Sequence, residues 1–151
     1  MVINSYAKIN LSLIVKKRLN NKLHDLQSIY CLIDLKDKIS IKKIKKKNDL
    51  ISFTGPHSKY ISKYNNSIKK VLVFLRKNNI ITDYYSIKIY KNIPVFAGFG
   101  GGTSNAAAIL KFLIKKNISQ NLLNKITKII GSDLGLFFHN QGYLKNLKSI
   151  S

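Results

Sequence analysis

The residues with the clearest chemical meaning lie between Pro94 and Ala108, a stretch that holds four of the eight glycines in this chain of 151 residues. Glycine lets the backbone adopt positive φ and approach an oxyanion closely, and the first turn of a following helix presents unpaired N–H groups. An alternating apolar segment precedes the glycines, and apolar residues follow them at helical spacing. The pattern predicts a phosphate-binding loop between a strand and a helix, in which the hydroxyls of Thr103 and Ser104 are available to phosphate or metal.

Two common phosphate loops do not fit this stretch. A Walker A loop ends in Gly-Lys-Ser/Thr, but here Gly102 is followed by Thr103 with no lysine. A dinucleotide fingerprint needs an acidic residue about 20 positions on, yet the only acid after Asp83 is Asp133. A plain glycine-rich turn remains the alternative, although three consecutive glycines cost backbone entropy that an ordinary turn does not require.

Lys8, Asn10 and Asp133 are the other candidates for chemistry. Lys8 and Asn10 project from one side of an alternating segment whose other side carries Ala7, Ile9, Leu11, Leu13 and Val15. Asp133 stands between a helix end and an apolar run, where a carboxylate is costly unless a cation or hydrogen-bond donor meets it. We therefore expect Lys8 and Asp133 to lie within one residue's reach. The alternatives are a solvated strand face for Lys8 and a helix-capping role for Asp133.

The elements that must position these residues follow from hydrophobic periodicity and capping residues. Alternation and β-branched content predict strands over residues 5–15, 26–33, 39–44 and 85–91, and the start of another over 141–147. Helical spacing predicts three helices: one from Ser67 to before Asn78, one after the glycines, and one between Ser119 and Gly131. Residues 48–64 show no clear period and are expected to hold at most one short strand. The predicted fold class is α+β.

Composition narrows the partners and the compartment. A formal net charge of +21 allows nucleic acid or a phosphorylated ligand as partner. Only Arg18 and Arg76 are arginines, and the lysine excess accompanies many asparagines and isoleucines, which also indicates an AT-rich coding sequence. The single cysteine, Cys31, excludes an internal disulfide and favours a reducing compartment. No signal peptide or long apolar run is found, so we expect a cytoplasmic protein without a membrane partner.

Three motifs resemble one protein family. The pattern Pro-x-x-x-Gly-x-Gly-Gly-Gly-Thr-Ser-Asn-Ala-Ala from Pro94 closely resembles the ATP-binding motif of the GHMP kinases, which include galactokinase, homoserine kinase and mevalonate kinase. Residues 7–11, Ala-Lys-Ile-Asn-Leu, resemble the first motif of one branch, the 4-diphosphocytidyl-2-C-methyl-D-erythritol kinases. Residues 131–138 resemble the Gly-Ser-Asp-Val-Pro-Phe-Phe motif of that branch, with Leu134 for valine and Gly135 for proline.

The resemblance implies phosphoryl transfer from ATP, with Mg²⁺ bridging the phosphates, to the 2-hydroxyl of a diphosphocytidyl methylerythritol. Asp133 would be the catalytic base, and Lys8 would polarise the site. Asn10 and His24 would bind the substrate, although Leu23 replaces the tyrosine that stacks on cytosine in the family. No residue is assigned as a metal ligand. The cofactor-binding residues would be Pro94, Val95, Phe96, Ala97, Gly98, Phe99, Gly100, Gly101, Gly102, Thr103 and Ser104.

The resemblance also implies domain organisation. Residues 1–151 would form the N-terminal GHMP domain, which is similar to domain 2 of ribosomal protein S5, and the second, ferredoxin-like domain would be absent. We therefore expect no turnover by these residues alone, the missing half being supplied, if at all, by a separate chain, and exposure of Phe99, Phe137 or Phe138. The alternative is a basic nucleic-acid-binding module with an S5-like fold. That module predicts a lysine-rich face with aromatic or arginine residues, whereas a kinase predicts Lys8, Asp133 and the glycines in one cleft.

Overall fold

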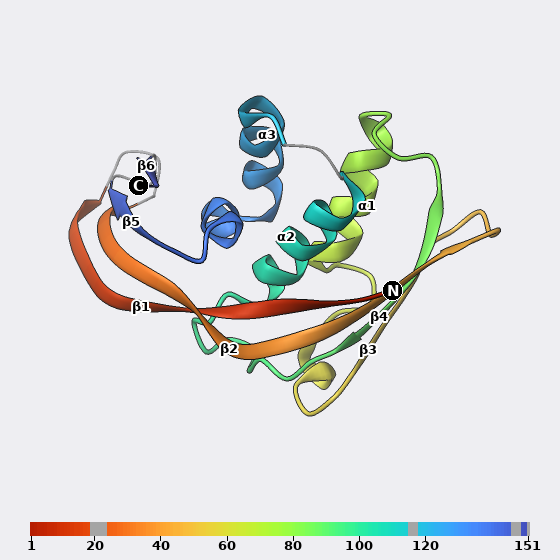
Figure 1. Ribbon diagram of the computed structural model, residues 1–151, viewed down its shortest axis with the longest axis horizontal. Helices are drawn as coiled ribbons and strands as arrows, with labels where there is room; N and C mark the ends of the chain where they lie inside the picture. Colours follow the sequence, from red (N-terminus) through yellow and green to blue (C-terminus); the bar gives the residue numbers. More distant parts are fainter. Residues whose placement is uncertain (19–23, 115–117, 146–148, 151) are drawn as a thin grey trace.

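The computed structural model describes residues 1–18, 24–114, 118–145 and 149–150. Within these residues, one mixed sheet is covered on one face by helices (Figure 1). The strands are β1 (Val2–Arg18), β2 (His24–Ile44), β3 (Leu50–Thr54), β4 (Tyr84–Tyr90), β5 (Gln141–Lys145) and β6 (Ser149–Ile150). The helices are α1 (Ser67–Lys77), α2 (Gly101–Leu113) and α3 (Gln120–Ile130), with 3₁₀ segments η1 (Ser58–Tyr60) and η2 (Ser132–Phe138). The predicted α+β class is confirmed.

The sheet is organised around β2. The strand order is β3-β4-β2-β5-β6, and β1 pairs with β2 along most of its length. Only the β3–β4 pair is parallel among the described strands, and α1 lies on the connection between these two strands. The other pairs are antiparallel. The glycine-rich segment connects β4 to α2, which confirms the predicted passage from strand to helix.

The prediction of separate strands over 26–33 and 39–44 is wrong, because β2 runs through both ranges. Its first half pairs with β5 and its second half with β4. The polar segment between the two ranges contains no glycine or proline that would break the strand. The extra residues are absorbed as a bulge instead, since Ala7 pairs with Ile33 while Tyr6 pairs with Lys36.

The core lies between the sheet and the helices. Ile39, Ile41, Ile87 and Ile89 of the sheet pack against apolar residues of α1 and α2, which include Ile68, Val71, Leu72, Leu75, Ala106, Ile109 and Leu110. The predicted caps are confirmed, because the side chain of Asn66 accepts from the Lys69 N–H at 2.9 Å and that of Ser119 accepts from the Leu122 N–H at 3.3 Å. None of the helices in the described ranges combines the length and hydropathy needed to cross a bilayer.

The expected alternation along β1 holds only in its first part, where Ser5 and Ala7 are buried and Tyr6 between them is exposed. Ala7 is fully buried, but Leu11, Leu13 and Val15 are 63%, 52% and 55% exposed. The pairing with β2 shifts by one residue between Asn10 and Ser12, and the outer part of the β1–β2 ladder extends beyond α1 and α2 (Figure 1). The expectation that Phe137 is exposed is also wrong, since it is buried against α2, and Phe99 and Phe138 are half-buried.

Candidate active site

The glycine loop, residues 91–100, has the backbone geometry that its composition predicts. Phe96, Gly98 and Gly100 have φ values of +64°, +78° and +68°. Gly100 is the N-cap of α2, so the following residues present their N–H groups at the start of a helix. The strand, the glycine loop and the helix N-terminus therefore form an anion-binding arrangement.

A cavity of about 440 Å³ lies over this loop. Its walls come from the glycine loop, the start of α2 and the segment that leads from η1 to α1. All of the predicted cofactor-binding residues from Pro94 to Thr103 line it, together with Tyr60, Ile61, Asn65, Asn66, Ser67, Lys91 and Asn105. The cavity combines an apolar part, where Tyr60 and Ile61 lie, with the polar start of a helix.

Ser104 is the predicted cofactor-binding residue that does not line the cavity. Its side chain is buried, and its hydroxyl donates to the Tyr6 carbonyl oxygen at 2.6 Å. Because that bond uses the only hydroxyl hydrogen of Ser104, the Ser5 hydroxyl donates to Ser104 in the 2.7 Å contact between them. In this structure Ser104 joins α2 to β1 and faces away from the space where phosphate would bind.

The glycines at positions 100 and 101 are closely packed inside the protein. A Cβ on Gly100 would lie 2.6 Å from the Phe137 ring, and a Cβ on Gly101 would lie 3.0 Å from the Ile93 side chain. Gly102 differs, because a Cβ there would meet only the Ser67 Oγ at 3.8 Å. Position 100 therefore excludes a side chain, whereas a Cβ at position 101 would need Ile93 to shift by a few tenths of an ångström.

Lys8 and Asp133 lie together, as predicted. The Lys8 Nζ is 3.3 Å from Asp133 Oδ2, with the lysine side chain buried and the aspartate side chain 41% exposed. The same Nζ donates to Asn10 Oδ1 at 3.1 Å, and the Ser28 hydroxyl, which has its shortest contact with the Ser12 carbonyl oxygen at 2.8 Å, lies 3.2 Å from that amide oxygen. One buried ammonium group is thus shared by a carboxylate that solvent reaches and an amide oxygen.

This polar cluster adjoins the glycine loop. The backbone N–H of Lys8 donates to the Phe99 carbonyl oxygen at 3.0 Å. From the other side, Phe137 of η2 packs under Gly100, and η2 carries Asp133 in its first turn. Lys8 and Asp133 therefore adjoin the glycine loop, but neither residue is among those that line the cavity, so the predicted convergence of all three in one cleft is met only in part.

Two side chains hold η2 in place. The Tyr30 hydroxyl, inside the protein, donates to the Leu136 carbonyl oxygen at 3.3 Å, and burial raises the pKa of Tyr30. The Lys111 ammonium of α2 donates to the Phe137 carbonyl oxygen at 2.6 Å. Partial burial lowers the pKa of Lys111. Both contacts fix the segment that carries Asp133.

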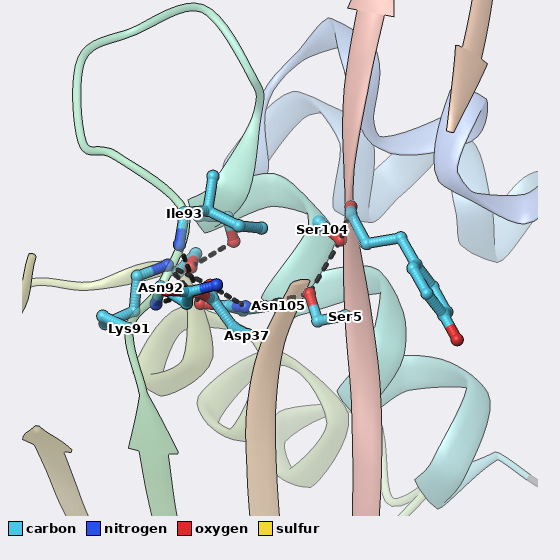
Figure 2. Close-up of polar contacts among 10 residues, drawn as sticks. Ser5, Asp37, Lys91, Asn92, Ile93, Ser104 and Asn105 are labelled. Carbon is cyan, nitrogen blue, oxygen red and sulfur yellow. Dashed lines mark hydrogen bonds and ion pairs between the residues drawn. The ribbon is translucent and has the colours of Figure 1, made fainter. Parts of the chain in front are cut away.

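Sequence reasoning missed a buried polar cluster beneath the loop (Figure 2). Asp37 is completely buried and forms an ion pair with buried Lys91, and Asn105 of α2 bonds to both. Asp37 stands in a charged run that looks solvated. A signal was nevertheless present, because strand alternation places Asp37 on the same face as Ile39 and Ile41, which is the face that packs into the core.

The remaining predicted sites are only partly described. His24 begins β2, paired with Arg18, but its side chain lies outside the described part of the structure, as does Leu23. Among the described residues no group of three or more His, Cys, Asp or Glu side chains is placed to hold a metal ion. Oxygen donors near the loop are the Thr103 hydroxyl, which lines the cavity, and the Asp133 carboxylate.

Comparison with known proteins defines the class to which this geometry belongs. Residues 66–139 match the family model described as the GHMP kinases N terminal domain. Residues 66–139 of this chain are thus similar to the N-terminal domain of the GHMP kinases, and they include the glycine loop, α2 and Asp133.

Individual relatives belong to one branch. The chain is 43% identical over 136 residues to the 4-diphosphocytidyl-2-C-methyl-D-erythritol kinase of Pelagibacter ubique, covering 87% of this chain and 48% of the relative. It is 34% identical over 155 residues to the kinase of the same name from Ureaplasma parvum, covering 99% of this chain and 58% of that protein. The chain thus spans about half the length of the curated relatives it matches.

Solved structures confirm the fold. A 4-(cytidine 5'-diphospho)-2C-methyl-D-erythritol kinase superposes with a TM-score of 0.72 at 22% identity, covering 100% of this chain and 54% of that one. The mevalonate kinase of Methanococcus jannaschii superposes with a TM-score of 0.67 at 15% identity, covering 98% of this chain and 54% of that one. Both of these chains extend beyond the matched half.

Proposed function

We propose that this chain is the ATP-binding half of a kinase that phosphorylates the 2-hydroxyl of 4-diphosphocytidyl-2-C-methyl-D-erythritol, in the non-mevalonate route to isoprenoid precursors. The observation that carries the proposal is the 3.3 Å contact between Lys8 and Asp133 beside a glycine loop to which Lys8 is also hydrogen-bonded. The names of the relatives support the acceptor. The lone cysteine supports a cytoplasmic location, because it leaves the chain without an internal disulfide.

ATP would place its phosphates against the start of α2. The backbone N–H groups of Gly101, Gly102 and Thr103 belong to the first turn of that helix, where they lack helical partners and carry the positive end of the dipole. The apolar part of the cavity, near Tyr60 and Phe96, would receive the adenine base. Ser104 is left out of this set because its hydroxyl is used within the protein.

The residues present fit Mg²⁺ bound mainly by phosphate oxygens and water. The Thr103 hydroxyl and the Asp133 carboxylate are hard oxygen donors, and Mg²⁺ sites in kinases use one or two such groups besides phosphate. Bound there, Mg²⁺ would neutralise charge on the phosphates. The described residues near the loop supply too few carboxylates to hold the ion without phosphate oxygens.

In the transfer step the acceptor oxygen would attack the γ-phosphorus while the bond from that phosphorus to the β–γ bridging oxygen breaks. Asp133 would accept the hydroxyl proton or orient the hydroxyl, and its 41% exposed carboxylate is open to a ligand. The buried Lys8 ammonium, held by Asn10, would stabilise the negative charge that develops beside it. Asn10 and His24 would contact the substrate. Together these residues would position the acceptor hydroxyl and stabilise the charge that develops during phosphoryl transfer.

The test is turnover by a fused chain, in which residues 1–145 are joined to the C-terminal half of the Pelagibacter ubique relative. With ATP, Mg²⁺ and 4-diphosphocytidyl-2-C-methyl-D-erythritol, we expect the fused chain to form product and the 151-residue chain alone to form none, because a half-cleft does not exclude water. Asp133→Asn should lower the rate of the fused chain by about 10²–10⁴. An undiminished rate in that variant would refute the assignment.

A basic nucleic-acid-binding module remains the second candidate, and one hollow favours it. A space of about 820 Å³ between α1, β3 and β4 is lined by Lys63, Tyr64, Lys69, Arg76, Tyr84 and Lys88, among others. Arg76 lies 4.3 Å over the Tyr84 ring and pairs with Asp49 at 3.1 Å. If this hollow binds nucleic acid, titration with DNA should show affinity that falls steeply with salt and drops in the triple variant of the three lysines to glutamine.

A further inference from the structure

One carboxylate contacts both arms of the glycine loop (Figure 2). Asp37 Oδ1 accepts from the backbone N–H groups of Asn92 and Ile93 at 2.8 and 2.9 Å, at the point where the chain enters the loop. Asp37 Oδ2 accepts from the Lys91 ammonium and from Asn105 Nδ2, the latter at 2.9 Å, in the helix that follows the loop. A single side chain of β2 thus fixes the distance between the two ends of the loop.

This carboxylate is kept in an environment that disfavours charge. Asp37, Lys91 and Asn105 are 0%, 2% and 2% exposed. A buried ion pair contributes little net stability compared with apolar residues of similar volume, and it is tolerated only when further hydrogen bonds satisfy it. The four donors around Asp37 provide that satisfaction. The phosphoryl transfer proposed above gives Asp37 no chemical role, so its function must lie in what it holds.

The cluster links β1, β2, the loop entrance and α2. Lys91 Nζ also donates to Asn105 Oδ1 at 3.1 Å, and Asn105 Nδ2 also donates to Ser5 Oγ of β1 at 2.9 Å. Lys91 packs directly under the first residue of α2, since a Cβ on Gly101 would lie 3.3 Å from its Nζ. Lys91 and Asn105 line the cavity as well. The cluster therefore lies directly beneath the helix N-terminus that faces the cavity.

We infer that Asp37, Lys91 and Asn105 form a clasp that sets the spacing of the loop arms and so the aim of the first N–H groups of α2 at a phosphate. Asp37 is the positioning residue of this clasp. The identity of the ligand as a phosphate of ATP rests on the proposed function, whereas the effect of the clasp on the spacing of the loop does not. Catalytic sites respond strongly to small displacements of positioning groups, so a loosened clasp should weaken nucleotide binding without removing any group that touches the nucleotide.

A double substitution tests this inference, because it exchanges the carboxylate of Asp37 with the amide of Asn105. In Asp37→Asn the introduced amide N–H₂ group opposes either the donors of Lys91 and Asn105 or, with the amide flipped, the backbone N–H groups of Asn92 and Ile93. In the double variant Asp37→Asn, Asn105→Asp the carboxylate moves to α2, where it can pair with Lys91 and accept from the introduced amide. The oxygen of that amide can still accept from the two backbone N–H groups at the loop entrance. The Ser5 hydroxyl, which donates to Ser104 in the parent, has to turn toward the new carboxylate. We expect the single variant to weaken ATP binding in calorimetry by about tenfold or more, and the double variant to restore it.

Leu75→Ala is the control for stability alone, because Leu75 is buried in α1 about 12 Å along the helix from Ser67, which contacts Gly102 in the first turn of α2. It should leave ATP affinity unchanged at a temperature where all variants are folded. Asn105→Ala, which removes one arm of the clasp and leaves the ion pair intact, provides a second disrupting variant if Asp37→Asn does not fold.

Amide hydrogen exchange measured without nucleotide separates the clasp from the proposed function. Exchange over residues 92–103 should speed up in the disrupting variant and return to the parent rate in the double variant, with the rest of the described core unchanged. Failure of the parent to bind ATP would reject the proposed function and leave exchange to decide on the clasp. Parent-like exchange in both disrupting variants, or no recovery in the double variant, would overturn it.

Discussion

The backbone N–H of Lys8 donates to the carbonyl oxygen of Phe99 at 3.0 Å, so the strand that carries the ammonium group is bonded directly to the glycine loop. The side chain of the same residue reaches Asp133. Lys8 therefore joins the loop through its main chain and the carboxylate through its side chain. A substitution that keeps the backbone intact separates these two links.

Lys8→Met is expected to preserve the link to Phe99 and remove the charge. ATP affinity should stay close to the parent value, whereas the turnover rate of the fused chain should fall by about 10²–10³, because a preorganised charge near the reacting groups is lost. Calorimetry and initial rates measure the two effects. Lys36→Met is the matched control, since Lys36 pairs with exposed Asp34 on the surface. Equal losses in both variants would argue against a specific role for Lys8.

Alanine at Gly100 and at Gly102 should have opposite consequences. At Gly100 the added Cβ meets Phe137 and the residue keeps positive φ, so we expect a loss of about 2 kcal/mol or more in unfolding free energy. At Gly102 the Cβ makes only an ordinary van der Waals contact with the Ser67 Oγ at 3.8 Å, so the fold should be unaffected while ATP affinity falls. Urea unfolding and calorimetry give the two readouts. Valine at Gly100 or Gly101 would be a poorer test of ATP binding, because its side chain would meet Phe137 or Ile93 and disturb the core first.

Thr103 and Ser104 are adjacent hydroxyls with different expected roles. Thr103→Ala should weaken ATP binding by about 1.5–3 kcal/mol if its hydroxyl meets phosphate or metal, with little effect on stability. Ser104→Ala should lower the unfolding free energy by about 1–3 kcal/mol, because it leaves the Tyr6 carbonyl oxygen without that donor. The two variants serve as controls for each other. The reverse pattern would place Ser104 at the nucleotide and contradict the structure.

Tyr30→Phe should change how stability depends on pH. Burial raises the folded pKa of Tyr30 above its unfolded value of 10.0, so the folded state binds more protons than the unfolded state just above pH 10. The stability that the neutral hydroxyl contributes is full below pH 10 and is lost as pH rises toward the folded pKa. The variant should cost about 0.5–1.5 kcal/mol near pH 8 and lose less stability than the parent above about pH 10. Parallel urea curves for parent and variant across this range would rule out the effect.

Phe96 offers an optical test of the nucleotide cavity. It is 90% exposed at the cavity rim, and the chain contains no tryptophan, so Phe96→Trp introduces a single tryptophan whose emission can be excited apart from that of the tyrosines. ATP should change its emission more than tripolyphosphate does, because only ATP carries a base that can stack on the indole ring. Tyr64→Trp, exposed at the other hollow, should not respond to ATP. A response at position 64 and none at position 96 would move the base to that hollow.

Sequence patterns predicted the glycine loop, both helix caps and the approach of Lys8 to Asp133, because each depends on local chemistry or on a charge that needs a partner. They failed where the structure depends on contacts between segments that lie far apart in the sequence. The continuity of β2 depends on a bulge opposite Tyr6 and on two different neighbours for its two halves, and neither can be read from β2 itself. The burial of Phe137 depends on glycine at position 100, far away in sequence.

The candidate site shows the same division. The motif residues from Pro94 to Thr103 gather at one cavity, while Ser104 turns inward because α2 must attach to β1. The burial of Asp37 was not predicted, because its charged neighbours are typical of a solvent-exposed segment. Strand alternation nevertheless places Asp37 on the same face as Ile39, which packs into the core. The catalytic and substrate-binding roles given to Lys8, Asp133, Asn10 and His24 stay predictions.

The outer end of β1 presents an apolar surface on a chain that is otherwise strongly basic. Leu11, Leu13, Ile14 and Val15 are each more than half exposed, on a chain whose formal charge is +21. Mutual repulsion keeps such copies apart in dilute buffer, but the Debye length shrinks from about 30 Å at 0.01 M salt to about 8 Å at 0.15 M. Self-association should therefore increase with ionic strength. Once salt screens the lysine charges, copies of this chain should associate through the apolar outer end of β1.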